Sequence, residues 1–267
     1  ADAEGVLQRI ACNDVAVEPG RIVYTQFLNE LGGIEADVTI TRLDSDRFIV
    51  VTPAATIRRD VNWINRQIPD GAHCMAMDIT AMESVIVVMG PEARDFLQPL
   101  IPQSLDSADF PFGTMQEVEI GYARARAHRV SYVGELGWEL YVPADMAVHV
   151  YDTLMQRSAD HPLMHCGLHT LDSCRIEKAF RHFGHDISSE DHIIDAGLGF
   201  AARIGKQSGR FGDFIGRDSV LRRKEEGVKA RMFQFRLNDP QPLLYHNEAV
   251  MRAVSYTHLT LPTTEYV

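Results

Sequence analysis

Closely spaced cysteine pairs are missing from this chain of 267 residues, and the four cysteines that it has are scattered. They are Cys12, Cys74, Cys166 and Cys174. Because a disulfide framework or a cysteine-rich zinc site needs recognisable spacings such as Cys-x-x-Cys, the sequence argues against both. We therefore expect the protein to work in a reducing compartment.

Long apolar runs are also missing. No stretch approaches the roughly 18 residues of a membrane-spanning helix, and the start lacks the basic-then-apolar pattern of a signal peptide. No Gly-x-Gly-x-x-Gly follows an expected strand, and neither a Walker loop nor a Gly-x-Ser-x-Gly elbow is present. The sequence therefore gives no support for an FAD-binding Rossmann domain, for nucleotide hydrolysis or for serine esterase chemistry. Any oxidation linked to this chain would take place elsewhere.

Positive charge is scarce, with a formal net charge of −11. This charge argues against nonspecific binding to nucleic acid or to anionic membranes. The dense basic run at 222–224 is followed at once by two glutamates, which is typical of a solvated helix end. The length and the hydrophobic content of 45% are sufficient for a substantial core in one large domain or in two ordinary ones.

Strand-like and helix-like segments are mixed along the chain. Strands are expected at 37–43, 47–51, 84–89, 117–120, 128–132, 138–142 and 232–237. Helices are expected at 91–100, at 144–155 with Val148, Tyr151 and Met155 on one face, and at 165–180 with Leu168, Leu171 and, more loosely, Cys174 aligned. The mixture predicts an α+β fold of antiparallel sheets with packed helices.

The segment 131–143 is the most informative part of the sequence. Gly134 and Gly137 permit positive φ or a close backbone approach, and the strand-like residues that follow predict a hairpin that carries Glu135 and Glu139. Glycine-rich hairpins are most often plain connections, and Glu135 is interpreted as a turn residue. The order of residues in this segment is nevertheless specific.

A second glycine turn, Gly32 and Gly33, precedes Asp37 at the start of an expected strand. An acid beside apolar neighbours such as Ile34 and Val38 can have a raised proton affinity, which suits it for exchanging a proton with a ligand amine. An ordinary turn aspartate is the alternative interpretation.

These two turns, together with the segments 13–15, 24–37, 89–91, 172–177 and 184–187, resemble the aminomethyltransferase (glycine-cleavage T-protein-like) family. The resemblance covers about residues 1 to 253 and is strongest to the C-terminal folate domain of dimethylglycine and sarcosine dehydrogenases. It implies a T-protein-like folate-binding fold and a location in the bacterial cytoplasm or the mitochondrial matrix.

The resemblance also implies roles for individual residues. Asp37 matches the aspartate that faces the reactive nitrogens of tetrahydrofolate, and is the candidate catalytic residue. Tyr24, Tyr132 and Glu139 match pterin or folate contacts, which is sensible because tyrosines can cover a flat ring and a carboxylate can accept its N–H groups. Without the resemblance, core packing would be the preferred interpretation of both tyrosines.

Arg175 matches the arginine of the family's Arg-hydrophobic-Glu motif and is expected near the benzoyl and glutamate end of folate. Asp172 stands three residues before it and could hold its guanidinium. His165 and His169 have an i, i+4 spacing, but no further ligand pair of recognised spacing accompanies them, so no metal site is expected. His182 and His185, and likewise Glu177, are interpreted as structural.

The function implied by the resemblance is one-carbon transfer. In such dehydrogenases an N-terminal FAD domain oxidises an N-methyl amine, and the C-terminal domain captures the one-carbon unit on tetrahydrofolate as methylenetetrahydrofolate. The expected partners are folate and an FAD-binding oxidoreductase domain or subunit, with no nucleic acid and no membrane. A free-standing T-protein is one alternative, against which Leu136 and Trp138 argue, and a non-catalytic folate-binding module is another.

The expected domain organisation has three parts. Residues 1–228 form the folate-binding domain, from which upstream sequence is expected to be lost; 229–254 begin a C-terminal β-barrel; and 255–267 are a non-native tail that packs poorly. A weak boundary at 224–229, where a charged helix end meets an expected strand, supports the first division.

Overall fold

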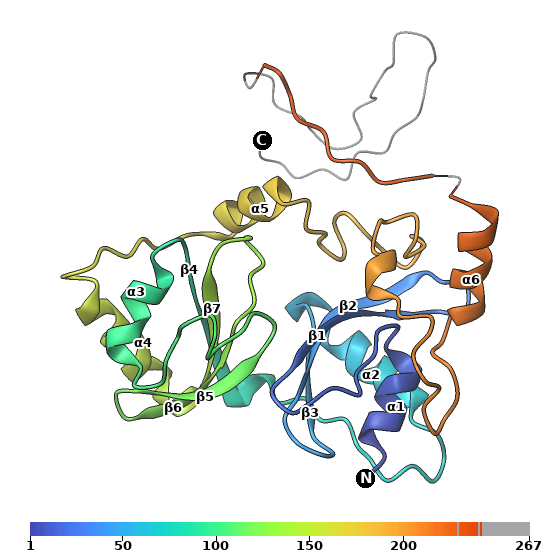
Figure 1. Cartoon of the computed structure of the whole chain (residues 1–267), viewed down its shortest axis with the longest axis horizontal. Helices are drawn as coiled ribbons and strands as arrows, with labels where there is room; N and C mark the ends of the chain where they lie inside the picture. The colour runs from blue at the N-terminus through green and yellow to red at the C-terminus, as the bar shows by residue number, and fades with distance from the viewer. Residues whose placement is uncertain (229, 240, 242–267) are drawn as a thin grey trace.

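Two antiparallel sheets lie side by side in the computed structural model of the protein, which describes residues 1–228, 230–239 and 241 (Figure 1). The first sheet has the order β1-β2-β3 and the second the order β4-β7-β6-β5. This arrangement confirms the predicted α+β fold of antiparallel sheets with packed helices. Within the described residues no helix is both long enough and apolar enough to cross a membrane.

The first sheet separates an apolar face from a polar one. It consists of β1 (Ile22–Leu28), β2 (Ile34–Arg42) and β3 (Phe48–Val51). Alternate residues of β2, namely Ile34, Ala36, Val38 and Ile40, are buried. Helices α1 (Ala3–Ile10) and α2 (Ile57–Gln67) supply further core residues, and the ring of Trp63 stacks on that of Phe27 with centroids 5.2 Å apart. Because side chains alternate along a strand, Asp37 projects to the opposite face.

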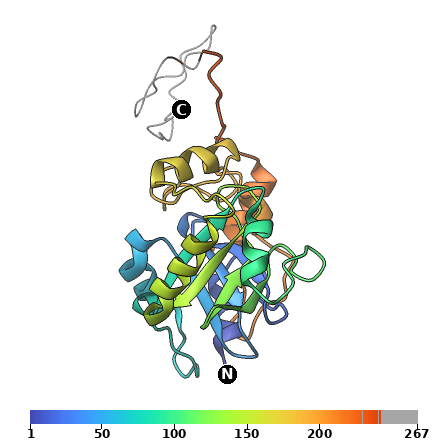
Figure 2. The ribbon, with the colours of Figure 1, turned by 90° about the vertical axis from the view of Figure 1, so that its left-hand side faces the viewer.

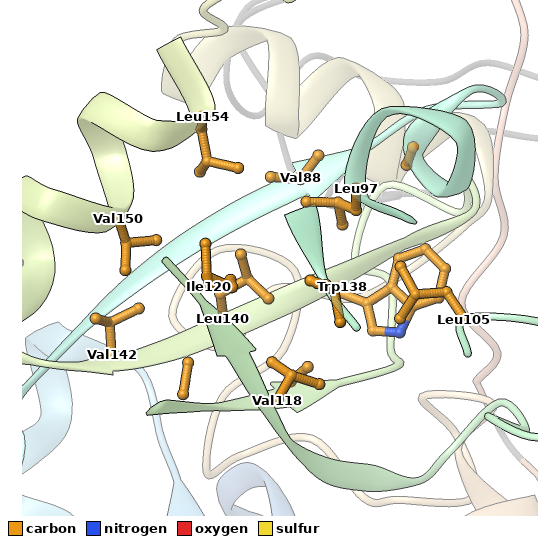
Figure 3. Packing of buried hydrophobic residues seen from close by; sticks show 14 of the residues in the cluster. Val88, Leu97, Leu105, Val118, Ile120, Trp138, Leu140, Val142, Val150 and Leu154 are labelled. Carbon is orange, nitrogen blue, oxygen red and sulfur yellow. The ribbon is translucent and has the colours of Figure 1, made fainter. Parts of the chain in front are cut away.

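The second sheet is built in the same way. It consists of β4 (Glu83–Met89), β5 (Met115–Ile120), β6 (Ala123–His128) and β7 (Gly137–Pro143), and α3 (Ala93–Leu97) and α4 (Ala147–Arg157) pack on it. Trp138, Leu140 and Val142 of β7 are fully buried beneath these helices. Figure 3 shows Val150 and Leu154 of α4 pointing toward this apolar face. Glu139 therefore projects from the other face of the sheet.

A third layer follows in the chain and lies across one end of both sheets (Figures 1 and 2). It contains α5 (Leu168–Glu177), α6 (Arg217–Glu226) and the long connections between them. Its apolar residues Ile187, Ile193, Phe214 and Val220 pack with Leu28 of β1. Short 3₁₀ helices occur at Ala54–Thr56, Thr80–Met82, Gln98–Leu100, Ala144–Met146 and Gly199–Ala201.

The expected strands 47–51, 84–89, 117–120 and 138–142 correspond to β3, β4, β5 and β7, which confirms them. The expected strand at 128–132 is wrong, because β6 ends at His128 and the hairpin loop is correspondingly longer. The strand at 232–237 is also wrong: these residues pair with no strand of the described chain, and Phe233 is 61% exposed. Most of the expected barrel start, and the whole of the tail at 255–267, lie outside the described residues.

The helix at 144–155 corresponds to α4, but the predicted apolar face is wrong. Val148 is 72% exposed and Tyr151 is 45% exposed, whereas Val150 and Leu154 are buried. The helix carries apolar residues on both faces, and it is the position of the second sheet that selects one of them. In α5 the expected apolar alignment is also wrong, since Leu168 is 79% exposed and the buried residue is Arg175.

Ala179, just after α5, has a left-handed backbone with φ of 56°, and no other non-glycine residue of the described chain has a positive φ. The Phe180 N–H donates to the Arg175 carbonyl at 2.9 Å, which closes the helix end around Ala179. Because a left-handed conformation costs an L-residue roughly 1 kcal/mol, Ala179→Gly is expected to raise the free energy of unfolding by about that amount. Urea unfolding would measure it. The same change at Ala147, where φ is −59°, should give no gain.

Candidate functional site

Asp37 is half-buried on the polar face of the first sheet, directly opposite Gln26 in the β1-β2 register. The Gln26 side-chain amide donates to Asp37 Oδ1 at 2.8 Å. Burial raises the pKa of the Asp37 carboxyl, and the hydrogen bonds from Gln26 and Tyr24 and the positive charge of Arg181 oppose that rise. The site therefore holds an acid whose charged form is stabilised by specific neighbours against the cost of burial.

The predicted glycine turn does place this acid. Asn29 Oδ1 accepts the Gly33 N–H at 2.9 Å, which closes the turn between β1 and β2. A Cβ added at Gly33 would lie 2.2 Å from the Ser189 carbonyl oxygen, so only glycine permits this approach of the third layer. The turn then sets the register that places Asp37 beside Gln26.

Tyr24 stands two residues before Gln26 and therefore shares its face of β1. Burial raises the pKa of the Tyr24 hydroxyl, and the charge of Asp37 and a hydrogen bond to it raise that pKa further. The ring of Tyr24 stacks with that of Phe200 at a centroid distance of 6.2 Å, and Phe200 is 74% exposed. A flat aromatic surface thus lies next to the acid.

Tyr132 comes from the loop between β6 and β7, yet it reaches the same surroundings. Its hydroxyl donates to the Arg181 carbonyl at 2.9 Å, and its ring stacks with that of Phe180 at 6.4 Å. Burial raises the pKa of the Tyr132 hydroxyl; the charge of Arg175 opposes that rise, and Asp37 is among the anions that add to it. The structure therefore brings Asp37, Tyr24 and Tyr132 into one electrostatic neighbourhood.

Glu139 lies on β7 of the second sheet. Its Oε2 accepts the Tyr141 hydroxyl at 2.9 Å. Burial raises the pKa of the Glu139 carboxyl, and the Tyr141 hydrogen bond opposes that rise; Asp37 is not among the groups that act on it. On the same sheet face Val85 and Val87 of β4 are about half exposed, at 49% and 51%.

One surface hollow among the described residues lies apart from both Asp37 and Glu139 in its lining. It lies along α2 and is lined by Arg59, Asn62, Asn65 and Arg66. A common cleft for the acid of the first sheet and the glutamate of the second remains a prediction from the sequence.

The predicted hairpin glycines fulfil the two uses expected of them. Gly134 has φ of 74°, and a Cβ at Gly137 would lie 2.4 Å from the Val88 carbonyl oxygen of β4. Gly137 thus permits β7 to begin against β4, and this pairing places Glu139 opposite Val87.

His128 ends β6 beside Glu139 and Tyr141 and is 1% exposed. Its ring lies 4.2 Å from that of Tyr141. Burial, with a smaller contribution from the charge of Arg126, lowers the pKa of His128 from 6.5 to about 3. The buried imidazole is therefore neutral in the folded protein at neutral pH.

This histidine should contribute to acid sensitivity. Because its pKa is lower in the folded than in the unfolded state, only the unfolded chain takes up its proton between pH 6.5 and about pH 3. Its contribution to stability is complete above pH 6.5 and falls below it, by up to about 1.4 kcal/mol per pH unit. His128→Phe should therefore lose less unfolding free energy on acidification than the wild type, as measured by urea unfolding across that range. Parallel pH dependences would contradict this expectation.

Arg175 is buried, with 1% exposure, and its guanidinium is largely engaged by the protein. Nε donates to Asp172 at 3.1 Å, which confirms the expected i, i+3 pair, and Nη1 donates to Asp186 and, at 3.0 Å, to the Phe180 carbonyl. Nη2 is buried and has no hydrogen-bond partner among the described residues. Contact with the folate glutamate end stays a prediction, for which Nη2 is the nitrogen left over.

The histidines after α5 are arranged around the same helix. The rings of His182 and His185 lie 4.3 Å apart, and His182 Nδ1 is 3.5 Å from Asp172 Oδ1. In the described part of the chain no three His, Cys, Asp or Glu residues are grouped so that they could hold a metal ion. His165 Nε2 lies 3.1 Å from the Tyr151 hydroxyl.

Three residues of this region were missed in the sequence: Gln26, Tyr141 and Arg181. Gln26 and Tyr141 could have been found by strand alternation, since each stands two residues from a predicted site residue. Arg181 carries no such signal, because it lies in an irregular connection that only the packed structure brings to Tyr132.

The fold and the comparisons with known proteins define an aminomethyltransferase-like domain. The structure is similar to the crystal structure of glycine cleavage system aminomethyltransferase T from Bartonella henselae, with a TM-score of 0.71 and 25% sequence identity, over 85% of this chain and 59% of that one. The model of the family described as GCVT N-terminal domain matches residues 1–206, and the chain belongs to this family.

Longer proteins are also similar to this chain. It is 43% identical over 251 residues to 4-methylaminobutanoate oxidase (formaldehyde-forming) of Paenarthrobacter nicotinovorans, and the aligned region covers 93% of the chain and 30% of the oxidase. It is 31% identical over 265 residues to mitochondrial sarcosine dehydrogenase of Mus musculus, and the aligned region covers 94% of the chain and 28% of the dehydrogenase. The chain thus spans under a third of the length of either relative.

Proposed function

We propose that this domain binds tetrahydrofolate and transfers to it the one-carbon unit released by oxidation of an N-methyl amine, giving methylenetetrahydrofolate. The oxidation would belong to an FAD-dependent part of a dimethylglycine or sarcosine dehydrogenase-like protein. The observation that carries the proposal is a half-buried acid, Asp37, that accepts a hydrogen bond from Gln26 and lies beside Tyr24 on the neighbouring strand. The similarity to an oxidase described as formaldehyde-forming and to sarcosine dehydrogenase supports it.

The residues present fit a reduced folate. The rings of Tyr24, Phe200 and Tyr132 offer flat apolar surfaces, and within the described part of the chain the carboxyl of Asp37 has polar partners rather than an ion pair. Glu139 offers a second acceptor on the neighbouring sheet. When bound, tetrahydrofolate supplies the amine nitrogens that take up the one-carbon unit.

The chemical role of the protein is to transfer protons to and from the ligand and to position the ligand. Gln26 donates to Oδ1 of Asp37, and Tyr24 also hydrogen-bonds this carboxyl, so both residues orient the acid toward a ligand amine. Because burial raises the pKa of the Asp37 carboxyl while its neighbours oppose the rise, Asp37 can accept a proton from a ligand nitrogen and return it. The aromatic rings exclude water around the acid and hold a flat ring in a productive orientation.

A combined binding and rate measurement tests this function. Isothermal titration of the protein with tetrahydrofolate should show binding, and formaldehyde with tetrahydrofolate should react faster than the uncatalysed background. Absence of binding would contradict the proposal entirely. Binding without any rate above background would favour a non-catalytic folate-binding module.

Two substitutions separate binding residues from the catalytic acid. Tyr24→Ala removes an aromatic surface and Glu139→Ala removes an acceptor, so each is expected to weaken tetrahydrofolate binding about tenfold, or roughly 1–2 kcal/mol. Isothermal titration measures the change. Tyr122→Ala is the matched control, because Tyr122 is 91% exposed at the turn between β5 and β6. Affinity equal to that of the control would refute either assignment.

A further inference from the structure

We propose that Tyr141 is a positioning residue that holds the carboxylate of Glu139 as a hydrogen-bond acceptor, so that this side chain selects ligands that present N–H donors. The part that concerns the ligand rests on the proposed function, in which Glu139 is an acceptor for the folate. The hydrogen bond itself is a property of the free protein. Tyr141 stands two residues after Glu139 on β7, so both side chains project from the same face of the second sheet.

The contact between these two side chains is direct. The Tyr141 hydroxyl donates to Oε2 of Glu139 at 2.9 Å. In the part of the chain that the structure describes, no second donor reaches the Glu139 carboxylate and no cation forms an ion pair with it, so Oε1 is left over. Tyr141 therefore sets the direction in which this carboxylate points.

Tyr141 is itself held in place by its neighbours, and only 6% of it is exposed. The ring of His128 lies 4.2 Å from its ring. Arg126 lies opposite Tyr141 in the β6-β7 register and forms an ion pair with Glu83 of β4. Because β7 lies between β6 and β4, this ion pair spans β7 beside Tyr141. The hydroxyl is thus presented to Glu139 by a closely packed ring with little freedom to turn away.

The Tyr141 hydroxyl also favours the ionised form of Glu139. Burial raises the pKa of the Glu139 carboxyl, and the Tyr141 hydrogen bond opposes that rise. A protonated carboxyl would carry an O–H donor of its own, whereas the ionised group only accepts hydrogen bonds. The nearby His128 imidazole is neutral at neutral pH, and the charges of Arg126 and Glu83 are paired with each other. None of these groups therefore supplies a net charge that would replace the hydrogen bond.

An acceptor held in this way discriminates between ligands. A flat ring that presents amine and amide N–H groups, as a pterin does, can donate to Oε1 of Glu139. A ring that presents acceptors at this point would leave polar groups unpaired on both sides, which weakens binding. Val87 lies opposite Glu139 in the β4-β7 register and is about half exposed, so apolar surface for a flat ring lies beside the acceptor.

Titration of Glu139 in the ligand-free protein tests the assignment. Its side-chain carboxyl carbon, identified by the loss of the signal in Glu139→Gln, can be followed by NMR across pH in wild type and variants. Tyr141→Phe keeps the ring and removes the donor, so the titration midpoint of Glu139 should rise by about one pH unit. Tyr151→Phe is the matched control, because the Tyr151 hydroxyl on α4 also contacts a titratable side chain, His165 Nε2 at 3.1 Å. It should leave the midpoint of Glu139 unchanged.

Isothermal titration with tetrahydrofolate extends the test to the ligand. The affinity of Tyr141→Phe should be about tenfold weaker than that of the wild type at neutral pH. It should also fall more steeply on mild acidification, because protonated Glu139 no longer accepts the ligand N–H groups. Tyr151→Phe should bind as the wild type does.

An unchanged Glu139 midpoint in Tyr141→Phe, or an equal shift in Tyr151→Phe, would overturn the proposal. Tyr141→Leu also lacks the donor, and it decides the question if Tyr141→Phe fails to fold. A raised midpoint with unchanged tetrahydrofolate affinity would overturn the selection of the ligand. If the wild type fails to bind tetrahydrofolate, the proposed function fails, while the titration still decides whether Tyr141 holds Glu139.

Discussion

Replacement of Asp37 by asparagine should lower the rate of one-carbon transfer to tetrahydrofolate by about 100- to 10,000-fold, the range that a positioned general acid or base contributes. The amide has nearly the shape of the carboxylate, and its oxygen can still accept the Gln26 side-chain N–H that holds Oδ1 at 2.8 Å. It cannot take up a proton from a ligand amine. We therefore expect folate affinity to change only a few-fold.

Formaldehyde capture by tetrahydrofolate, with affinity from isothermal titration of the same samples, would measure both quantities. Asp37→Ala should show the same division, with a larger effect on rate than on affinity. Glu35→Gln is the matched control: Glu35 is on the same strand, but it pairs with Arg59 at 2.6 Å. Wild-type rates in Asp37→Asn would refute the catalytic assignment.

Replacement of Arg175 by methionine should lower the free energy of unfolding by about 3–5 kcal/mol, which is the usual cost of breaking a buried ion pair by removing one partner. The guanidinium is 1% exposed and contacts both Asp172 and Asp186. Its loss would leave both carboxylates without their cation, and the Phe180 carbonyl would lose its donor. Lysine should rescue little, since one ammonium cannot replace three directed N–H contacts.

Urea unfolding of three variants would check this expectation. Arg47→Met removes an exposed pair with Asp44 and should cost much less. Arg175→Met combined with Asp186→Asn should recover part of the lost unfolding free energy, because the unpaired negative charge of Asp186 is then removed as well. A loss for Arg175→Met no larger than that for Arg47→Met would show that the buried network contributes little.

Arg175 has a structural task whether or not it contacts folate. The family resemblance assigns it to folate, and the structure gives it a structural network whose only unpaired nitrogen is Nη2 within the described chain. The same network anchors Phe180 and thereby the connection that carries Arg181. If an Arg175 variant loses folate binding, its unfolding curve must therefore be measured as well, so that a direct contact with folate can be told from a loss of stability.

Local features of the fold were readable in the sequence. The two glycine turns require positive φ or a close approach whatever surrounds them, and they correctly placed Asp37 on β2 and Glu139 on β7, although β2 begins at Ile34, three residues before the expected start. Strand periodicity likewise located β3, β4, β5 and β7. The pair of Asp172 and Arg175 follows from helical spacing alone.

The tertiary structure decided what depends on distant partners. The buried face of α4 could not be chosen from its own residues, because both faces carry apolar side chains and the second sheet selects Val150 and Leu154. The segment at 232–237 has a strand-like composition, but a strand exists only where another strand pairs with it.

The candidate site likewise has some features that the sequence predicts and others that depend on the tertiary structure. The glycine turns are local signals of the sequence, and it is the family resemblance that predicts Asp37, Tyr24 and Tyr132 as site residues. Only the tertiary structure decided that the Tyr132 hydroxyl donates to the Arg181 carbonyl, and that Glu139 accepts the Tyr141 hydroxyl on its own sheet. The physical reason is that the burial and the electrostatic surroundings of a residue are set by the groups that the fold packs against it. An irregular connection such as the one after α5 has no periodicity from which the positions of its side chains could be predicted.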